Sequence, residues 1–306
     1  MAFEKDLKKI DHRSWNYIRD KWLGYLPEIN PPGNAPDEEI ADLLDIEEIA
    51  GQASIAAGLQ IRKEVTYLRS EIFREGIYLF HKASNVNNSG LFHIENGILS
   101  WSISSAYHSS FFSLKSILCL LGLSFPRVKS KNKCLMIDCF PENEKLSSKQ
   151  KKNNYQPPPE LKFLLMSDIG HEHYWSILQR VIRVSNIPIW DQEITKYLIS
   201  FNPSDFTIQR NSIHYKNNFW LIVEDLFTRK QEPNFAHFTN LFNSISKIKK
   251  ENLDYSFLIS FLLLHLSYTL IKDISTVAPI LSEEFGLINN YLADESNIRM
   301  VKSIKF

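Results

Sequence analysis

The chain has 306 residues, of which 44% are hydrophobic and 23% are charged, so it can bury a substantial core as one large domain or two. Lys plus Arg and Asp plus Glu both number 35, and this balance excludes a bulk electrostatic attraction to nucleic acid or membrane. A partner that is attracted by charge would therefore need a local charged patch on the protein surface.

The N-terminal part of the chain shows three stretches with helical patterning. In the first, apolar residues recur at helical intervals: Trp15, Ile18, Trp22 and Leu26. Residues 37–48 hold seven acids and no base among apolar positions, a pattern typical of an amphipathic helix with a solvated acidic face. Helical spacing resumes over 61–82, and the Asn, Ser and Gly residues of 85–90 predict its end.

The next stretch predicts a long core helix over residues 99–123. Its apolar seam steps by four and three residues: Tyr107, Phe111, Leu114, Leu118 and Leu121. Gly122 lies where a helix C-terminus is expected. Most residues of 104–110 are small, so a second helix can approach closely, which suits a helical bundle or a helix-mediated dimer.

A basic segment follows at residues 127–152, with eight Lys or Arg against three acids and a net charge of +5. Residues 134–140 within it are a candidate short strand, and three prolines at 157–159 follow it. We interpret 127–159 as a loop-like, mobile insertion joining two parts of a bundle. Its charge would attract phosphate, and the alternative is a merely solvated basic loop.

A new helix is expected to start after Asn202, because a capping side chain is followed by an early proline, a serine and an acid. Further helices are expected over 235–248, 252–273 and 278–292. Few strand signals and no internal repeat are visible, so the predicted fold class is all-α, a helical bundle.

The predicted organisation has three parts. Residues 1–94 form an N-terminal helical region, residues 95–230 a helical core that contains the basic insertion, and residues 231–306 a C-terminal helical region.

One polar cluster interrupts the apolar stretch 206–220: Arg210, Asn211 and His214. On a helix, residues at i and i+4 have Cβ atoms about 5–6 Å apart, so the Arg and His side chains can reach one phosphate. The alternative is structural, with Arg210 paired to an acid and His214 a satisfied, partly buried histidine.

Two segments resemble the HEPN family. Residues 106–123, AYHSSFFSLKSILCLLGL, are similar to the family's Tyr- and His-bearing helix that ends in Gly, and residues 210–215, RNSIHY, resemble its later Arg-polar-x-x-His signature. Fewer residues lie between Arg210 and His214 than is usual in the family. The resemblance covers about 95–228.

The resemblance implies an all-α metal-independent endoribonuclease of a bacterial toxin–antitoxin or antiphage defence system. It also implies a homodimer that joins two Arg-His motifs, a partner or antidote protein, and no cofactor. A second hypothesis stays open, in which the chain is a non-catalytic HEPN-like module that binds a partner protein or a nucleotide.

The chemistry of the cluster is compatible with RNA cleavage. Arg210 would hold the scissile phosphate bidentately, and His214 would move a proton to or from the ribose 2′-OH or the leaving oxygen. Asn211 would orient one of these groups. No metal is needed, because the 2′-OH is an internal nucleophile. Further RNA contacts are expected from Lys129, Lys131, Lys133 and Tyr215.

Other histidines give weaker signals. His171 and His173 would point to different faces of a helix, so we expect a surface feature rather than a metal site. His108, in the helix that resembles HEPN proteins, faces either Arg210 across the bundle or the core.

The sequence favours a cytoplasmic protein without membrane association. The first 15 residues lack the apolar run of a signal peptide. The three cysteines have neither disulfide-framework nor zinc-ligand spacing. The most apolar run, 257–271, is interrupted by two Ser and a His, and its 15 residues fall below the roughly 18 of a membrane span.

Overall fold

A computed structural model describes residues 2–11, 13–25, 44–55, 61–63, 65–96, 98–129, 132–141, 160–202, 204–205, 211 and 254–276. The helices in these residues are α1 (Ala2–Leu7), α2 (Trp15–Tyr25), α3 (Leu44–Ile55), α4 (Thr66–Glu95), α5 (Leu99–Leu120), α7 (His171–Val184), α8 (Gln192–Ser200) and α12 (Asp254–Ser275). The strands are β1 (Arg13–Ser14), β2 (Ile61–Lys63), β3 (Leu123–Ser124), β4 (Arg127–Val128), β5 (Lys133–Asp138), β6 (Leu161–Met166) and β7 (Ser185–Asn186).

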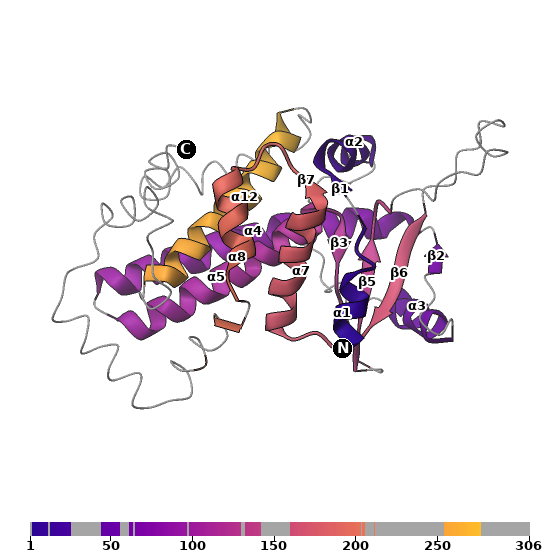
Figure 1. Ribbon diagram of the computed structural model, residues 1–306, viewed down its shortest axis with the longest axis horizontal. Helices are drawn as coiled ribbons and strands as arrows, with labels where there is room; N and C mark the ends of the chain where they lie inside the picture. The colour runs from indigo at the N-terminus through magenta and orange to yellow at the C-terminus, as the bar shows by residue number, and fades with distance from the viewer. Residues whose placement is uncertain are drawn as a thin grey trace.

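The fold is mostly helical, but it is not all-α, so that prediction was wrong in part. Figure 1 shows α4, α5 and α12 running alongside one another on one side of the molecule and the larger sheet on the other, with α7 between them. The helices and the sheet contribute to a single apolar cluster. The predicted boundary between residues 94 and 95 falls in the last turn of α4, which packs on α5; the division into three regions stays a prediction.

The long core helix was predicted correctly. α5 spans Leu99–Leu120, and Gly122 follows it with φ +75°, a left-handed conformation that glycine adopts without a Cβ clash. A Cβ at this position would lie 2.8 Å from the Phe140 ring, so the close contact with the chain after β5 also requires glycine.

The small residues of α5 allow close helix packing, as their spacing predicted. A Cβ on Gly90 of α4 would lie 3.1 Å from the Cβ of Ser105, tighter than most real contacts. Ser109 Oγ donates a 2.8 Å hydrogen bond to the Ala83 carbonyl, and Ser260 Oγ of α12 donates to Ser109 Oγ at 2.8 Å. This face of α5 is therefore covered by helices of the same chain.

Helix α4 begins later and ends later than its pattern predicted. β2 occupies 61–63, and the helix continues through 85–90 to Glu95. Asn87 Oδ1 lies 2.9 Å from Ser260 Oγ inside the helix interface, where Asn87 is buried. Asn, Ser and Gly residues often mark the end of a helix. Here they form small and polar contacts between helices instead.

The larger sheet is antiparallel, with the order β2-β6-β5-β3 and with β4 also paired to β5. The candidate strand in 134–140 was correct, because β5 pairs with β6 in the register Leu135↔Leu165. For the described residues 127–129 and 132–141, the prediction of a loop-like insertion was wrong, since most of these side chains are buried. Residues 142–159 lie outside the described part.

The predicted N-terminal helix is present as α2, and its apolar residues Trp15, Ile18 and Trp22 are buried. Leu26 lies outside the described residues. Of the acidic helix expected over 37–48, the structure describes only the part from residue 44, which begins α3.

Two tryptophans of α2 make long-range hydrogen bonds. Trp22 Nε1 donates to the Leu120 carbonyl at 2.7 Å, and Trp15 Nε1 donates to Asp273 Oδ2 at 2.7 Å. These indole N–H groups tie α2 to the ends of α5 and α12.

A buried ion pair fixes β1 against the larger sheet. The Arg13 guanidinium contacts Asp138 of β5, and the side chains are 3% and 1% exposed. Arg13 Nη1 also donates to the Leu121 carbonyl at 3.2 Å, and Asp138 Oδ1 accepts from Phe140 N at 3.0 Å. β1 itself pairs in parallel with β7, so Arg13 joins three separate parts of the chain.

Helix α12 is a core helix rich in apolar side chains. Among the described helices, one segment, Ser256–Ser275, is long and apolar enough to cross a membrane, and 67% of its apolar stretch is buried inside the fold. Buried helices of water-soluble proteins share this composition. The expectation of a protein without membrane association stays a prediction.

His265 of α12 is expected to make stability depend on pH. Burial lowers the pKa of His265 to about 4, with Asp191 opposing and Lys272 reinforcing the shift. Since the unfolded value is about 6.5, the folded state binds fewer protons between these values. The free energy of unfolding should therefore fall, by up to roughly 3 kcal/mol, as pH drops from 6.5 towards 4.

Urea unfolding at pH 7 and at pH 4.5 measures this effect. His265→Gln should show a smaller loss between the two pH values than the unchanged chain, because the glutamine does not titrate. Equal losses in the two proteins would contradict a titrating role for His265.

Candidate functional site

The predicted catalytic cluster lies mostly outside the described residues. Arg210, His214, Lys131 and Tyr215 are not among them, and Asn211 is helical and partly buried. Lys129 and Lys133 are exposed and flank the β4–β5 turn. The relative geometry of the cluster and these lysines therefore stays a prediction.

The segment that leads into the cluster is well anchored. Asn202 Oδ1 accepts a 3.2 Å hydrogen bond from Ser204 N, as the predicted helix start requires, and Ser204 and Asp205 are helical. Just before it, Gln179 Nε2 of α7 donates to the Phe201 carbonyl at 2.8 Å. The chain thus enters the segment of Arg210 from a position fixed by α7.

Helix α5 carries an aromatic and histidine cluster that contacts α7. Tyr107 Oη lies 2.8 Å from His171 Nδ1, and the His171 ring stacks on Phe111 with centroids 4.1 Å apart and planes at 5°. His108 Nδ1 lies 2.9 Å from the Ser104 carbonyl, a contact within the same helix. α5 and α7 are therefore joined by polar as well as apolar contacts.

The pair His171 and His173 is placed differently from the prediction. His171 is packed against α5 rather than being only a surface feature, while His173 Nδ1 accepts a 2.8 Å hydrogen bond from Gly170 N at the start of α7. The two rings serve different contacts, as the helical spacing implied. In the part of the chain that the structure describes, no group of three or more His, Cys, Asp or Glu is arranged to hold a metal ion.

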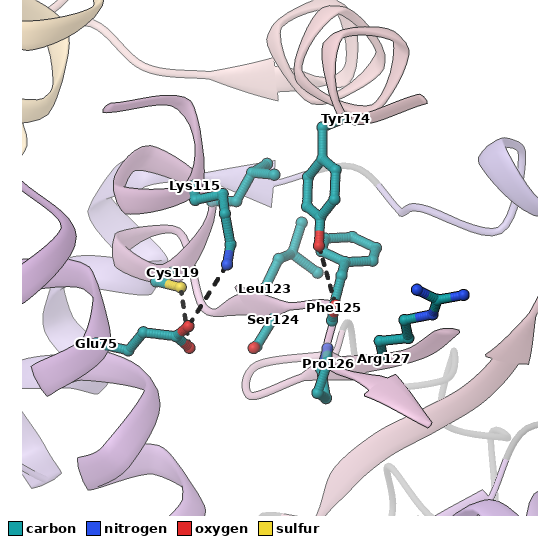
Figure 2. Close-up of a pocket in the computed structure, with 10 residues that line it drawn as sticks. Glu75, Lys115, Cys119, Leu123, Ser124, Phe125, Pro126, Arg127 and Tyr174 are labelled. Carbon is teal, nitrogen blue, oxygen red and sulfur yellow. Dashed lines mark hydrogen bonds and ion pairs between the residues drawn. The ribbon is translucent and has the colours of Figure 1, made fainter. Parts of the chain in front are cut away.

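A pocket of about 170 Å³ opens between α4, α5, α7 and the turn from β3 to β4, and its lining residues are shown in Figure 2. Its charged and polar lining comes from five chain segments: Glu75, Lys115, Cys119, Ser124, Arg127 and Tyr174. Lys115 Nζ approaches Glu75 Oε1 at 3.8 Å, and Cys119 Sγ approaches Glu75 Oε2 at 3.8 Å. Tyr174 Oη donates a 3.0 Å hydrogen bond to the Phe125 carbonyl.

The pocket is suited to binding rather than to nucleophilic chemistry. Burial raises the pKa of the Cys119 thiol well above its usual value, and the Glu75 charge raises it further. Burial also raises the pKa of Tyr174. Both groups are therefore neutral near pH 7, and a protonated thiol is a poor nucleophile.

Sequence reasoning missed this pocket, because its residues are far apart in the chain and no short motif marks them. The one available signal was Lys115, the single Lys or Arg of the largely apolar helix α5. Such a lysine more often extends its ammonium group to solvent.

Comparisons of the chain with protein-family models, with curated proteins and with solved structures found no match.

Proposed function

We propose that this chain is a metal-independent endoribonuclease with a HEPN-like helical core, acting as the RNA-cutting effector of a bacterial defence or toxin–antitoxin system. The observation that carries the proposal is the sequence cluster of Arg210, Asn211 and His214, which follows the capped helix start at Asn202. The proposal also uses the resemblance of residues 106–123, most of which lie in α5, to the family's Tyr- and His-bearing helix.

The proposed reaction uses the RNA's own ribose as the nucleophile. His214 takes the 2′-OH proton or delivers a proton to the leaving 5′ oxygen, and Arg210 offsets the charge that develops on the phosphate. Asn211 orients one of these groups. The products are a 2′,3′-cyclic phosphate and a 5′-hydroxyl end, and no metal or cofactor takes part.

The proposed assembly is a homodimer that brings two Arg-His motifs together. The Ser109 face of α5 is buried against α4 and α12 in the chain itself, so a dimer would have to use a different surface. RNA phosphates would be attracted by Lys129 and Lys133, which are exposed beside the β4–β5 turn, and by Lys131, while Tyr215 would provide a further RNA contact.

The purified chain should cleave single-stranded RNA in the presence of excess EDTA. Denaturing gels and mass spectrometry of the ends measure the product, with a cyclic phosphate expected. DNA of the same sequence is the matched control and should stay intact, since it lacks the 2′-OH. Cleavage that needs added Mg²⁺, or equal cleavage of the DNA, would contradict the proposal.

A second candidate function is a non-catalytic module that binds a protein partner. The observation that favours it is the exposure of two aromatic side chains: Phe92, in the last turn of α4, is 61% exposed, and Trp101, in the first turn of α5, is 57% exposed. Exposed aromatic side chains are enriched at protein interfaces. A chain that leaves RNA intact in the assay, and whose partner binding is lost in Trp101→Ser, would belong to this class.

A further inference from the structure

We propose that the pocket between α4, α5 and α7 binds a small organic anion, consisting of a carboxylate on a short apolar body. This binding activity is separate from the proposed cleavage of RNA. It uses side chains that are all described and that the Arg-Asn-His cluster does not include.

The charges at the pocket favour an anion. Two cations, Lys115 and Arg127, line it together with one carboxylate, Glu75. Lys115 Nζ lies 3.8 Å from Glu75 Oε1, which is an ion-pair distance but too long for a hydrogen bond, so the ammonium group retains donor capacity for a ligand oxygen.

Arg127 is held only weakly where it stands. Its guanidinium lies 3.4 Å from Asp168 Oδ2, and the two side chains are 64% and 50% exposed. Exposed ion pairs of this kind contribute little, because water screens them. The Arg127 side chain can therefore turn to a ligand at small cost.

The remaining walls suit a short apolar body. They are formed by Leu118, Leu123, Phe125 and Pro126. The volume of about 170 Å³ is close to that of an engineered cavity of about 150 Å³ that holds benzene. A single six-membered ring, or an aliphatic chain of similar bulk, therefore fits.

Figure 2 shows how the two kinds of lining are arranged. The Lys115 ammonium points towards Glu75 on one side of the pocket, with Leu123 and Phe125 beside it, and Arg127 lies on the other side. An anion among these groups would lie between the two cations, with its apolar part against the Leu and Phe side chains.

The test uses three probes with the same ring and different charge: benzoate, benzamide and benzamidine. NMR titration of the full chain is expected to give the tightest binding for benzoate. Inorganic phosphate serves as a fourth probe, and it should bind more weakly than benzoate because it has no apolar part. Tighter binding of benzamidine, or equal binding of phosphate and benzoate, would overturn the proposal.

Substitutions of the lining residues test whether the pocket prefers an anion or a cation. Lys115→Met should weaken benzoate binding by at least about tenfold, the usual effect of losing a hydrogen bond to a charged group. Glu75→Gln should tighten benzoate binding several-fold, because it removes the competing carboxylate. A cation or a zwitterion bound at Glu75 would give the opposite result, and this would also overturn the proposal.

Lys133→Met is the matched control, because it removes an exposed lysine that does not line the pocket. It should leave benzoate binding unchanged. Arg127→Gln provides a second test if Lys115→Met does not fold, and it should weaken benzoate binding but not benzamide binding. Loss of affinity in Lys133→Met equal to that in the lining variants would show a general charge effect and refute the assignment of the pocket.

Discussion

Replacing His214 by alanine is expected to lower RNA cleavage by about 10²–10⁴-fold, because a positioned proton-transfer group typically contributes that much to the rate. Arg210→Ala should cause a loss of about 10²–10³-fold through lost charge stabilisation in the transition state. Single-turnover cleavage of a labelled RNA measures both effects. Excess chelator should not alter the cleavage rate of the original chain or of the variants.

The control for these variants is thermal unfolding. If the pair acts on RNA, both variants should melt near the temperature of the unchanged chain. If it is a buried structural pair, both should lose roughly 2 kcal/mol or more of stability. His173→Asn is the matched histidine variant: asparagine can still accept the Gly170 N–H at the start of α7, so cleavage should be retained.

A His214→Ala variant that retains full cleavage would remove His214 from the mechanism. One that melts early would make it a residue of the fold. In either case the endoribonuclease proposal would depend on the family resemblance alone.

Asp138→Ala is expected to lower the free energy of unfolding by about 3–5 kcal/mol. The substitution leaves the Arg13 guanidinium buried without its counter-charge, and uncompensated buried charges cost that much. It also removes the acceptor for Phe140 N. Urea unfolding followed by circular dichroism measures the change.

The structure offers a matched control in Asp168, which pairs with exposed Arg127. Asp168→Ala should cost no more than about 1 kcal/mol. A double variant, Arg13→Met with Asp138→Leu, should recover much of the loss, because apolar side chains of similar volume often replace a buried ion pair without penalty. Equal effects of Asp138→Ala and Asp168→Ala would contradict a stabilising role for the buried pair.

The sequence predicted the helices best where the apolar residues follow a single period. Leu114 and Leu118 mark the seam of α5, and Gly122 marks its end, because a helix with one buried stripe shows a clear pattern. α4 was harder to delimit. Its Asn87 and Gly90 are contacts inside a helix interface, and the same residue types end helices elsewhere.

Strand β6 was missed for a physical reason. Its sequence, LKFLLM, has no polar–apolar alternation, because almost all of its side chains are buried, including Lys162. The Lys162 ammonium donates to Asp11 Oδ2 at 2.7 Å. A lysine that the sequence alone would place in solvent is therefore held inside the fold. A continuous apolar run of this length does not distinguish a buried strand from a helix.

The candidate sites differ in the same way. The Arg210 and His214 cluster is visible in the sequence because its residues are neighbours in the chain. The pocket is invisible there, because Glu75, Arg127 and Tyr174 come together only when α4, α7 and the larger sheet pack around α5. Local motifs reveal short-range chemistry, and tertiary packing creates the rest.

The position of α2 has a consequence for the order of events during protein synthesis. Trp22 and Trp15 of α2 contact Leu120 and Asp273, and Arg13 of the preceding β1 contacts Asp138; the sequence separations are 98, 258 and 125 residues, respectively. α4 and α5 are neighbours in the chain and can pack as soon as both have left the ribosome, whereas α2 is made earlier and must wait for partners made much later. Until Asp273 emerges, its tryptophan face lacks its final cover, and a translation pause before that point would lengthen the exposure of a surface suited to chaperone binding.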